Sequence, residues 1–199
     1  STLSLRRQRQ MCIRDRSGVL GDLIQVDAVF SYNNQADLEN IRNSSNMGGG
    51  GLPDIGVYTL GSVRFVTDQE PAAIRHVDIK YENGVDVWAL AAFDFPKFKF
   101  TSITSMRMAP RQEVTFQGTD GFIKLTAPFN PLVYDKAEII KRMNDGTEEV
   151  FSYPGVSQYV NQIEAFSDAV LNEKTYPCSL EFSQGTQAMI DSIFDFSST

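Results

Sequence analysis

Four consecutive glycines, at residues 48–51, precede an acid and a phenol, Asp54 and Tyr58. Glycine lets the backbone turn tightly and lets a ligand approach it closely. Asp54 and Tyr58 are spaced i, i+4, so their side chains share one face if the segment is helical, with Gly61 about one turn further on. A carboxylate and a phenol beside a surface without side chains would form a polar site that can hydrogen-bond a ligand.

The elements that must position this pair are a strand, a loop and a helix. Residues 23–31 alternate as a strand does, and a polar loop follows at residues 33–46. A helix is predicted over residues 52–65, since Pro53 is tolerated in a first helical turn and Asp54 favours a helix start. The glycine run therefore opens the predicted helix.

A series of strands follows this helix, separated by turn residues such as Asn83-Gly84, a pair that favours a hairpin. His76 lies on the polar face of the first of these strands and is interpreted as a solvent or interface residue. The phenylalanines near residues 93–100 and Trp88 are expected in the core and at the sheet surface. The predicted strands cover residues 74–81, 86–95, 98–108, 113–117, 122–127, 134–142 and 149–153.

The last part of the chain predicts two helices, because apolar residues recur there every three or four positions. Ser157 is a plausible cap for the first helix. The two apolar stripes are Val160, Ile163, Phe166, Val170 and then Met189, Ile190, Ile193, Phe194. The fold class is therefore α+β, a large, mostly antiparallel sheet with helices on one face. The other face of such a sheet commonly finds its cover in a second subunit.

Composition excludes several classes of function. The chain has 199 residues, a net charge of -7 and a pI of about 4.7, which argues against nucleic acid as a partner. No apolar run approaches the roughly 20 residues of a membrane span. One histidine and two cysteines, Cys12 and Cys178, suggest neither a metal site nor a disulfide framework. These features predict a cytoplasmic, metal-free protein.

The N-terminus differs from the rest of the chain. Residues 1–16 carry five arginines and one aspartate, without an amphipathic pattern or the apolar core of a secretory signal. We expect this segment to be a non-native or disordered tail, and residues 17–199 to form the domain.

Residues 48–58, Gly-Gly-Gly-Gly-Leu-Pro-Asp-Ile-Gly-Val-Tyr, resemble the signature of the Gfo/Idh/MocA family of NAD(P)-dependent oxidoreductases. Further pieces resemble the family in the same order along the chain, at residues 40–43, 116–121, 158–166 and 187–193. The resemblance covers nearly the whole chain. It implies the C-terminal domain of such an enzyme, with a fold like the C-terminal domain of glyceraldehyde-3-phosphate dehydrogenase.

Two family features are missing from the sequence. It has no Gly-x-Gly-x-x-Gly strand-turn-helix, the element with which members hold the dinucleotide. It also has no Glu-Lys-Pro, the motif whose lysine sits at the family's reaction centre, and Glu173-Lys174-Thr175 is only a near match. We therefore expect the substrate and oligomerisation domain of a truncated gene, with NAD or NADP bound mainly by an absent N-terminal domain.

The resemblance also implies roles for individual residues. Tyr58 would contact the reacting hydroxyl, and Asp54 would orient the substrate or a proton relay. Gly50 and Gly51 would make room for the nicotinamide. Arg42 and Asn43, in the loop that resembles the family, are the candidate substrate-binding residues, and Arg42 could bind a substrate hydroxyl or a phosphate. Simpler interpretations remain open. Asp54 could be only a helix-start carboxylate and Tyr58 only a packed aromatic ring. The glycines could form a plain flexible loop, and Arg42 could form a salt bridge within its loop.

The predicted reaction moves a hydride between nicotinamide and a sugar, polyol or dihydrodiol-like hydroxy compound. The expected partners are this small molecule and further copies of the chain, in a homodimer or tetramer formed through the open sheet face. The 199-residue chain is expected to be inactive by itself. Two alternatives stay open: a non-catalytic dimerisation or binding module, and an NAD-dependent glycosidase on the same fold.

Overall fold

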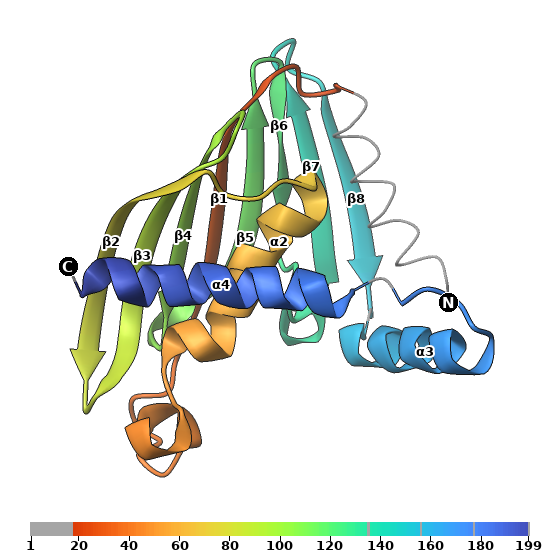
Figure 1. Ribbon diagram of the computed structural model, residues 1–199. Helices are drawn as coiled ribbons and strands as arrows, with labels where there is room; N and C mark the ends of the chain where they lie inside the picture. Colours follow the sequence, from red (N-terminus) through yellow and green to blue (C-terminus); the bar gives the residue numbers. More distant parts are fainter. Residues whose placement is uncertain (1–17, 135, 156, 177, 199) are drawn as a thin grey trace.

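The protein was analysed as a computed structural model, which describes residues 18–134, 136–155, 157–176 and 178–198. Its eight strands form one sheet in the order β2-β3-β4-β1-β5-β6-β7-β8 (Figure 1). Neighbouring strands run antiparallel except β1 and β4, which are parallel. The strands are β1 Leu23–Asn33, β2 Ala73–Glu82, β3 Val85–Asp94, β4 Lys99–Ser105, β5 Arg107–Gly118, β6 Gly121–Leu125, β7 Lys136–Met143 and β8 Glu148–Pro154. The predicted α+β class is confirmed.

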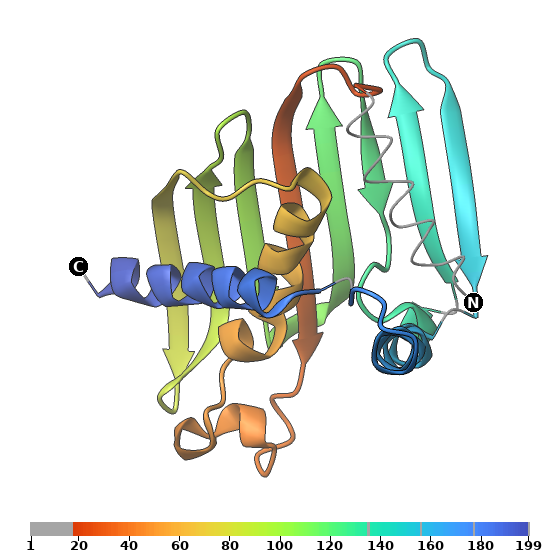
Figure 2. The same cartoon turned by 45° about the vertical axis from the view of Figure 1, so that its right-hand side comes forward.

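Two helices cover one face of the sheet, and a third lies away from it (Figures 1 and 2). The helices are α2 Val57–Thr67, α3 Gln158–Leu171 and α4 Leu180–Ser197, with short helical turns at η1 Ile41–Asn43, η2 Ser45–Met47, η3 Leu52–Gly56 and η4 Pro131–Tyr134. Helices α2 and α4 pack on each other and on the sheet, while α3 lies near the ends of β7 and β8. No helix in the described ranges is long and apolar enough to cross a membrane.

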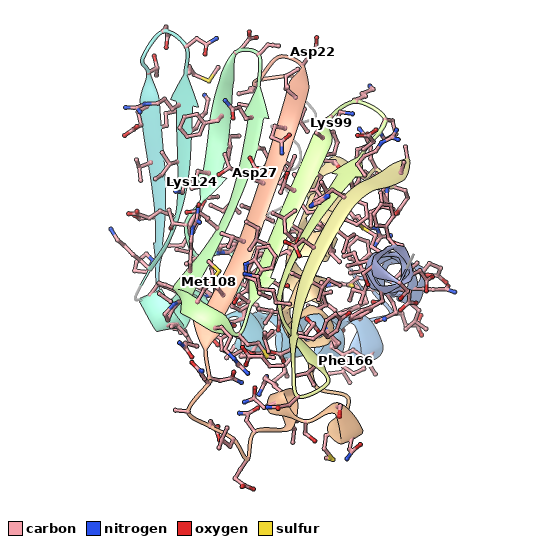
Figure 3. The ribbon with its side chains drawn as sticks, turned by 90° about the vertical axis from the view of Figure 1, so that its left-hand side faces the viewer. Asp22, Asp27, Lys99, Met108, Lys124 and Phe166 are labelled. Carbon is pink, nitrogen blue, oxygen red and sulfur yellow. The ribbon has the colours of Figure 1, made fainter. Side chains whose placement is uncertain are left out.

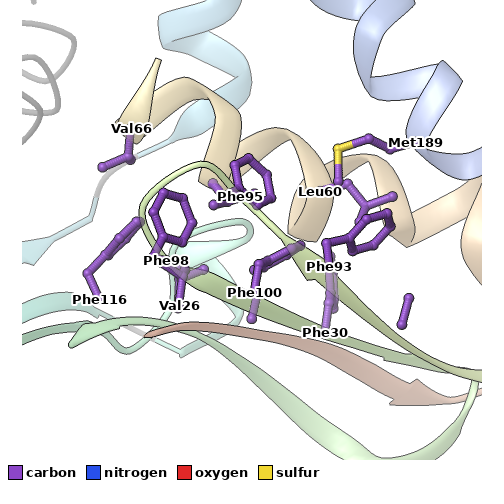
Figure 4. Packing of buried hydrophobic residues seen from close by; sticks show 14 of the residues in the cluster. Val26, Phe30, Leu60, Val66, Phe93, Phe95, Phe98, Phe100, Phe116 and Met189 are labelled. Atoms are coloured by element: carbon purple, nitrogen blue, oxygen red, sulfur yellow. The ribbon is translucent and has the colours of Figure 1, made fainter. Parts of the chain in front are cut away.

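The core fills the space between the sheet and helices α2 and α4, and it is rich in phenylalanine (Figure 4). Phe95 and Phe98 stack with ring centroids 4.7 Å apart, and Phe100 is fully buried beneath them. Leu60 of α2 and Met189 of α4 close this layer from the helix side. The expectation that the phenylalanines form core is confirmed.

No helix of the described residues lies on the opposite face of the sheet, which Figure 3 shows with Asp27, Lys99 and Lys124 on it. Trp88 lies half-buried on this face, with the Lys80 ammonium 5.2 Å from its ring centroid. His76 is exposed on β2, in agreement with its interpretation as a surface residue.

The predicted strand over residues 98–108 is confirmed as β4 up to Ser105, and its continuation to residue 108 is wrong. The chain reverses at Met106, so that β4 and β5 lie on opposite sides of β1. The buried Met106 holds this reversal: its N–H donates to Val87 O at 2.9 Å, and its carbonyl accepts from Asn34 N at 3.2 Å. Pro110, which cannot donate to a ladder, falls in the irregular register between β1 and β5. The reversal depends on contacts distant in sequence, with no turn residue to mark it.

Arg64 fixes α2 against α4. The side chain is buried, and its Nη1 donates to Phe182 O and Thr186 Oγ1, both at 2.6 Å. Its other guanidinium nitrogens bind the Glu70 carboxylate at 2.6 and 2.7 Å. Gly185 leaves the space that the guanidinium occupies, since a Cβ there would lie 2.2 Å from Nη2. A buried charge satisfied in this way fixes the direction of α2, the helix that carries Tyr58.

Candidate functional site

The glycine run ends against a buried carboxylate, that of Asp86 at the start of β3. Asp86 Oδ2 accepts a 2.6 Å hydrogen bond from Leu52 N, at the first residue of η3. Gly50 has a φ of 130°, and a Cβ added to it would lie 2.1 Å from Asp86 Oδ1. Gly51, also buried, faces the same carboxylate. The absence of side chains at these two glycines therefore leaves space for the Asp86 carboxylate, which binds the backbone where the helix begins.

Asp86 is also electrostatically unusual. Burial raises its pKa to about 6, even though the N–H groups of Leu52 and Gly51 favour the charged form. A largely dehydrated carboxylate at a helix N-terminus combines a cost of burial with a favourable interaction with backbone N–H groups. Residue type alone did not identify Asp86 as part of the site.

The helix after the glycines does not begin as a regular α-helix. Residues Leu52–Gly56 form a π-helical turn, and α2 begins only at Val57, so the helix predicted over residues 52–65 is present but opens with a wider turn. Pro53 lies in the first turn, as expected. Leu52 and Ile55 are buried in this turn, while Asp54 points outward. Wide turns of this kind are frequent at functional sites.

Asp54 is bound by two side chains from other elements. Tyr32, near the end of β1, donates its hydroxyl to Asp54 Oδ2 at 2.7 Å. Arg42, in η1, places its Nε 2.8 Å from the same oxygen. Oδ1 of Asp54 has no protein partner among the described residues. The loop salt bridge considered for Arg42 is therefore present, with Asp54 as its acid.

Tyr58 lies one turn beyond Asp54, at the start of α2. Its ring packs against Phe30 and Phe129, with centroids 5.5 and 5.6 Å away. The side chain remains partly exposed, with 36% of its surface accessible. Burial is the main cause that raises its pKa, followed by the neighbouring Tyr159 hydroxyl and the Asp54 charge, while Arg42 lowers it. Tyr58 is therefore a neutral phenol that holds its proton.

Asn43, the neighbour of Arg42, uses its side chain within the loop. Its Nδ2 donates to Asn34 O and Asp37 O, at 3.3 and 2.9 Å, and its Oδ1 accepts from Arg107 Nη2 at 3.1 Å. The mostly buried Arg107 also binds Glu82 Oε2 at 2.8 Å. This network holds the loop that presents Arg42, and a contact between Asn43 and substrate stays a prediction.

We call Tyr32, Arg42, Asp54 and Tyr58 the Asp54 site. Arg42 and Asp54 compensate each other's charge, and the Tyr58 ring beside them packs on buried phenylalanines. A free carboxylate oxygen and a partly exposed phenol can bind the hydroxyl groups of a neutral ligand. Within the described ranges, no three His, Cys, Asp or Glu side chains gather where they could hold a metal ion.

Sequence reasoning named three of these four residues and missed Tyr32. Its signal was present: Val26, Ala28, Phe30 and Tyr32 follow the inward alternation of β1, so a phenol was due on the helix side of the sheet. The signal for Asp86 was an acid next to buried Val85 and Val87 in an apolar strand. Neither signal indicates which residue the Tyr32 or Asp86 side chain contacts in the fold.

Comparison with known proteins identifies the class of domain. A family model described as the GFO/IDH/MocA C-terminal domain matches residues 11–124, more than half of the chain. The chain therefore belongs to the GFO/IDH/MocA family.

Individual relatives agree with this assignment. An uncharacterised oxidoreductase, ORF334, of Rhizobium meliloti is 32% identical over 183 residues, which cover 89% of this chain and 54% of that protein. The D-xylose 1-dehydrogenase (NADP(+)) 2 of Haloferax volcanii is 23% identical over 181 residues, or 90% of this chain and 55% of that protein. The chain thus spans about half the length of these relatives.

Solved structures show the same fold. The aldose-aldose oxidoreductase from Caulobacter crescentus, complexed with glycerol, superposes with a TM-score of 0.81 at 18% identity. The match covers 95% of this chain and 57% of that one. At this identity the likeness establishes the fold, and the chemistry must be argued from the site.

Proposed function

We propose that this chain is the substrate-side domain of an NAD(P)-dependent oxidoreductase that transfers a hydride between nicotinamide and a sugar, polyol or dihydrodiol-like hydroxy compound. The observation that carries the proposal is the pairing of Asp54 with Tyr58 on the turn that opens α2, a carboxylate with one free oxygen beside a partly exposed phenol. Family membership supports it, as does the name of the Haloferax relative, an NADP(+)-dependent xylose dehydrogenase.

The proposed chemistry divides between the cofactor and the protein. The dinucleotide, when bound, supplies or accepts the hydride. Tyr58 holds a proton at Oη at ordinary pH, since its pKa is raised, so it can donate to the carbonyl oxygen of a substrate that is being reduced. Asp54 accepts a hydrogen bond from a neighbouring substrate hydroxyl through Oδ1, and Arg42 offers the exposed part of its guanidinium to another oxygen.

In our proposal the described residues of this chain serve the reacting end of a dinucleotide. Gly50 and Gly51 are buried against Asp86, so in our proposal they serve the nicotinamide side indirectly, by allowing the turn that presents Asp54 and Tyr58. Most of the contacts to NAD or NADP would come from an N-terminal domain, as the length of the relatives suggests. The 199-residue chain alone is then inactive.

The open sheet face is the proposed interface of a homodimer or tetramer. Half-buried apolar side chains such as Trp88, Leu90 and Ile103 lie on this face among charged ones, and no helix in the described part of the chain covers them (Figure 3). Interfaces between identical chains commonly bury a mixture of this kind. A cytoplasmic location is part of the same proposal, in keeping with the acidic, cysteine-poor composition.

The test begins with the complete reading frame around this chain, expressed and assayed for NADP+ or NAD+ reduction with pentoses, hexoses and polyols. Tyr58→Phe is expected to lower kcat/KM by about 100-fold, the usual contribution of a proton-transferring side chain. Tyr81→Phe is the matched control, because Tyr81 is an exposed phenol on β2, and it should leave kcat/KM unchanged.

Three outcomes would reject the proposal. The first is full activity of Tyr58→Phe. The second is net glycoside hydrolysis without release of reduced cofactor, which would indicate the NAD-dependent glycosidase. The third is a reading frame without a dinucleotide-binding half whose product sediments as a stable dimer and binds neither sugar nor dinucleotide. That product would be a binding module.

A further inference from the structure

Tyr32 is the member of the Asp54 site to which neither the family resemblance nor the relatives give a role. It lies near the end of β1, on the side of the sheet that faces the helices, and its hydroxyl donates to Asp54 Oδ2 at 2.7 Å. Its ring is held independently of that hydroxyl. Phe30 lies 6.4 Å away in an edge-on arrangement, and the buried cluster of Val85, Val87 and Met106 packs against it.

The two protein donors to Asp54 converge on one oxygen atom. Arg42 Nε lies 2.8 Å from Oδ2, the atom that Tyr32 also binds. Two donors from different elements, β1 and η1, fix the carboxylate plane more firmly than either could alone, since each restrains a different direction. Among the described residues no hydrogen bond to Oδ1 is found, so its lone pairs are available to a ligand.

We propose that Tyr32 is a positioning residue for the reaction: with Arg42 it holds Asp54 through Oδ2, so that Oδ1 is presented in a fixed direction to a substrate hydroxyl. The inference rests on the proposed function of the Asp54 site. It adds that substrate orientation depends on a strand residue that need not touch the substrate.

Tyr32 and Tyr58 then have different tasks, although Phe30 packs against both rings. Burial and the bond to Asp54 raise the pKa of Tyr32 far above its usual value, so its proton stays on the hydroxyl and in that bond. Tyr58 is partly exposed and reaches the surface beside Asp54. Only Tyr58 is placed to exchange a proton with a ligand.

The decisive experiment compares Tyr32→Phe, Asp54→Ala and the double variant in the complete enzyme. Tyr32→Phe keeps the ring and its packing and removes only the hydrogen bond, so we expect kcat/KM for the hydroxy substrate to fall about 10-fold while KM for the dinucleotide stays unchanged. In the Asp54→Ala background the same change should have no further effect, because Tyr32 acts only through that carboxylate. A purely structural role would lower activity equally in both backgrounds.

A second measurement tests the hydrogen bond itself on the 199-residue chain. We expect proton NMR to show a slowly exchanging tyrosine hydroxyl signal that is absent from both Tyr32→Phe and Asp54→Ala, since each removes one partner of the hydrogen bond. Tyr81→Phe, the exposed control, should retain it.

The failures of the two proposals are distinguishable. If Tyr58→Phe loses activity and Tyr32→Phe does not, the positioning role is wrong and the proposed function stands. If Tyr58→Phe is fully active, the proposed function itself is wrong. Absence of the protected hydroxyl signal, or additive losses in the double variant, would also overturn the positioning role.

Discussion

Helices α3 and α4 carry similar apolar stripes, but only the stripe of α4 is buried. Helix α4 buries Thr186, Met189, Ile190 and Ile193 in the layer it shares with α2. Within the described residues α3 buries none, and Ile163 and Phe166 on its stripe are 65% and 59% exposed. The 3.6-residue period therefore tells which side of a helix is apolar, and it does not tell what covers that side.

The two helical regions also begin differently. The helical turn that leads into α2 begins at a buried carboxylate, since Asp86 accepts a hydrogen bond from Leu52 N. Helix α3 starts at an exposed hydroxyl, where Ser157 Oγ accepts from Val160 N at 3.4 Å, and Gln158 ties it to Asn130 at 2.9 Å. One region is integrated in the core, and the other is attached to it mainly at its first turn.

The largest expected effect comes from shortening one isoleucine in each stripe. Ile190→Ala in α4 is expected to lower the free energy of unfolding by about 3 kcal/mol, since it removes buried methyl groups and leaves a cavity. Ile163→Ala in α3 should change it by less than about 0.5 kcal/mol, because that side chain is mostly in water. Urea unfolding followed by circular dichroism measures both values.

The contrast would disappear if α3 were covered in solution. Equal losses for the two variants would mean that another copy of the chain packs on the α3 stripe. In that case the Ile163→Ala loss should shrink as the protein is diluted, because association stabilises by mass action.

The next effect concerns Asp86 and pH. Its folded-state pKa is about 6 against an ordinary value of 3.8, so between these values the folded protein holds a proton that the unfolded chain releases. This stabilisation is fully present below pH 3.8 and is lost as pH rises through 6. The shift corresponds to about 3 kcal/mol, at about 1.4 kcal/mol for each pKa unit. Asp86→Asn should remove this pH dependence from urea midpoints measured between pH 4 and 7.

Asp94 offers the matched control. Lys99 and Arg75 lower its pKa, so its stabilisation is present above the ordinary value and is lost only as pH falls below it. Asp94→Asn should therefore leave the slope between pH 5 and 7 unchanged. An Asp86→Asn curve parallel to that of the unsubstituted protein would show that the Asp86 carboxylate is not buried in solution.

Much of the fold follows from local patterns, and the errors lie where distant contacts decide. Alternation placed β1 and β2, and the 3.6-residue stripes predicted the existence of α3 and α4, although the stripe of α4 marks only the second half of that helix. The strand predicted over residues 98–108 was extended too far, because Met106 turns the chain by binding Val87 and Asn34, partners far away in sequence. The π-helical turn before α2 was missed for a related reason, since Asp86 binds the backbone there from another strand.

The candidate site shows the same division. Asp54 and Tyr58 are close in sequence, and a spacing argument found them. Tyr32 comes from β1 and Asp86 from β3, and only the register of the sheet brings them to the turn that precedes α2. A single sequence fixes which residues share a strand face. The sequence does not predict which of these residues contacts the first turn of a helix.

The smallest expected effect separates local from global stability through two caps of the same kind. Ser179 Oγ accepts from Phe182 N at 3.1 Å at the start of α4, as Ser157 does for α3. Removing a serine cap costs about 1 kcal/mol of helix stability. Since α4 belongs to the core, Ser179→Ala should lower the global free energy of unfolding by about that amount. Since α3 buries no side chain in the described structure, Ser157→Ala should leave the global free energy of unfolding unchanged and speed amide exchange only within α3.

Hydrogen exchange read by mass spectrometry, together with urea unfolding, distinguishes a local from a global loss of stability. A global loss in Ser157→Ala would mean that α3 unfolds together with the core.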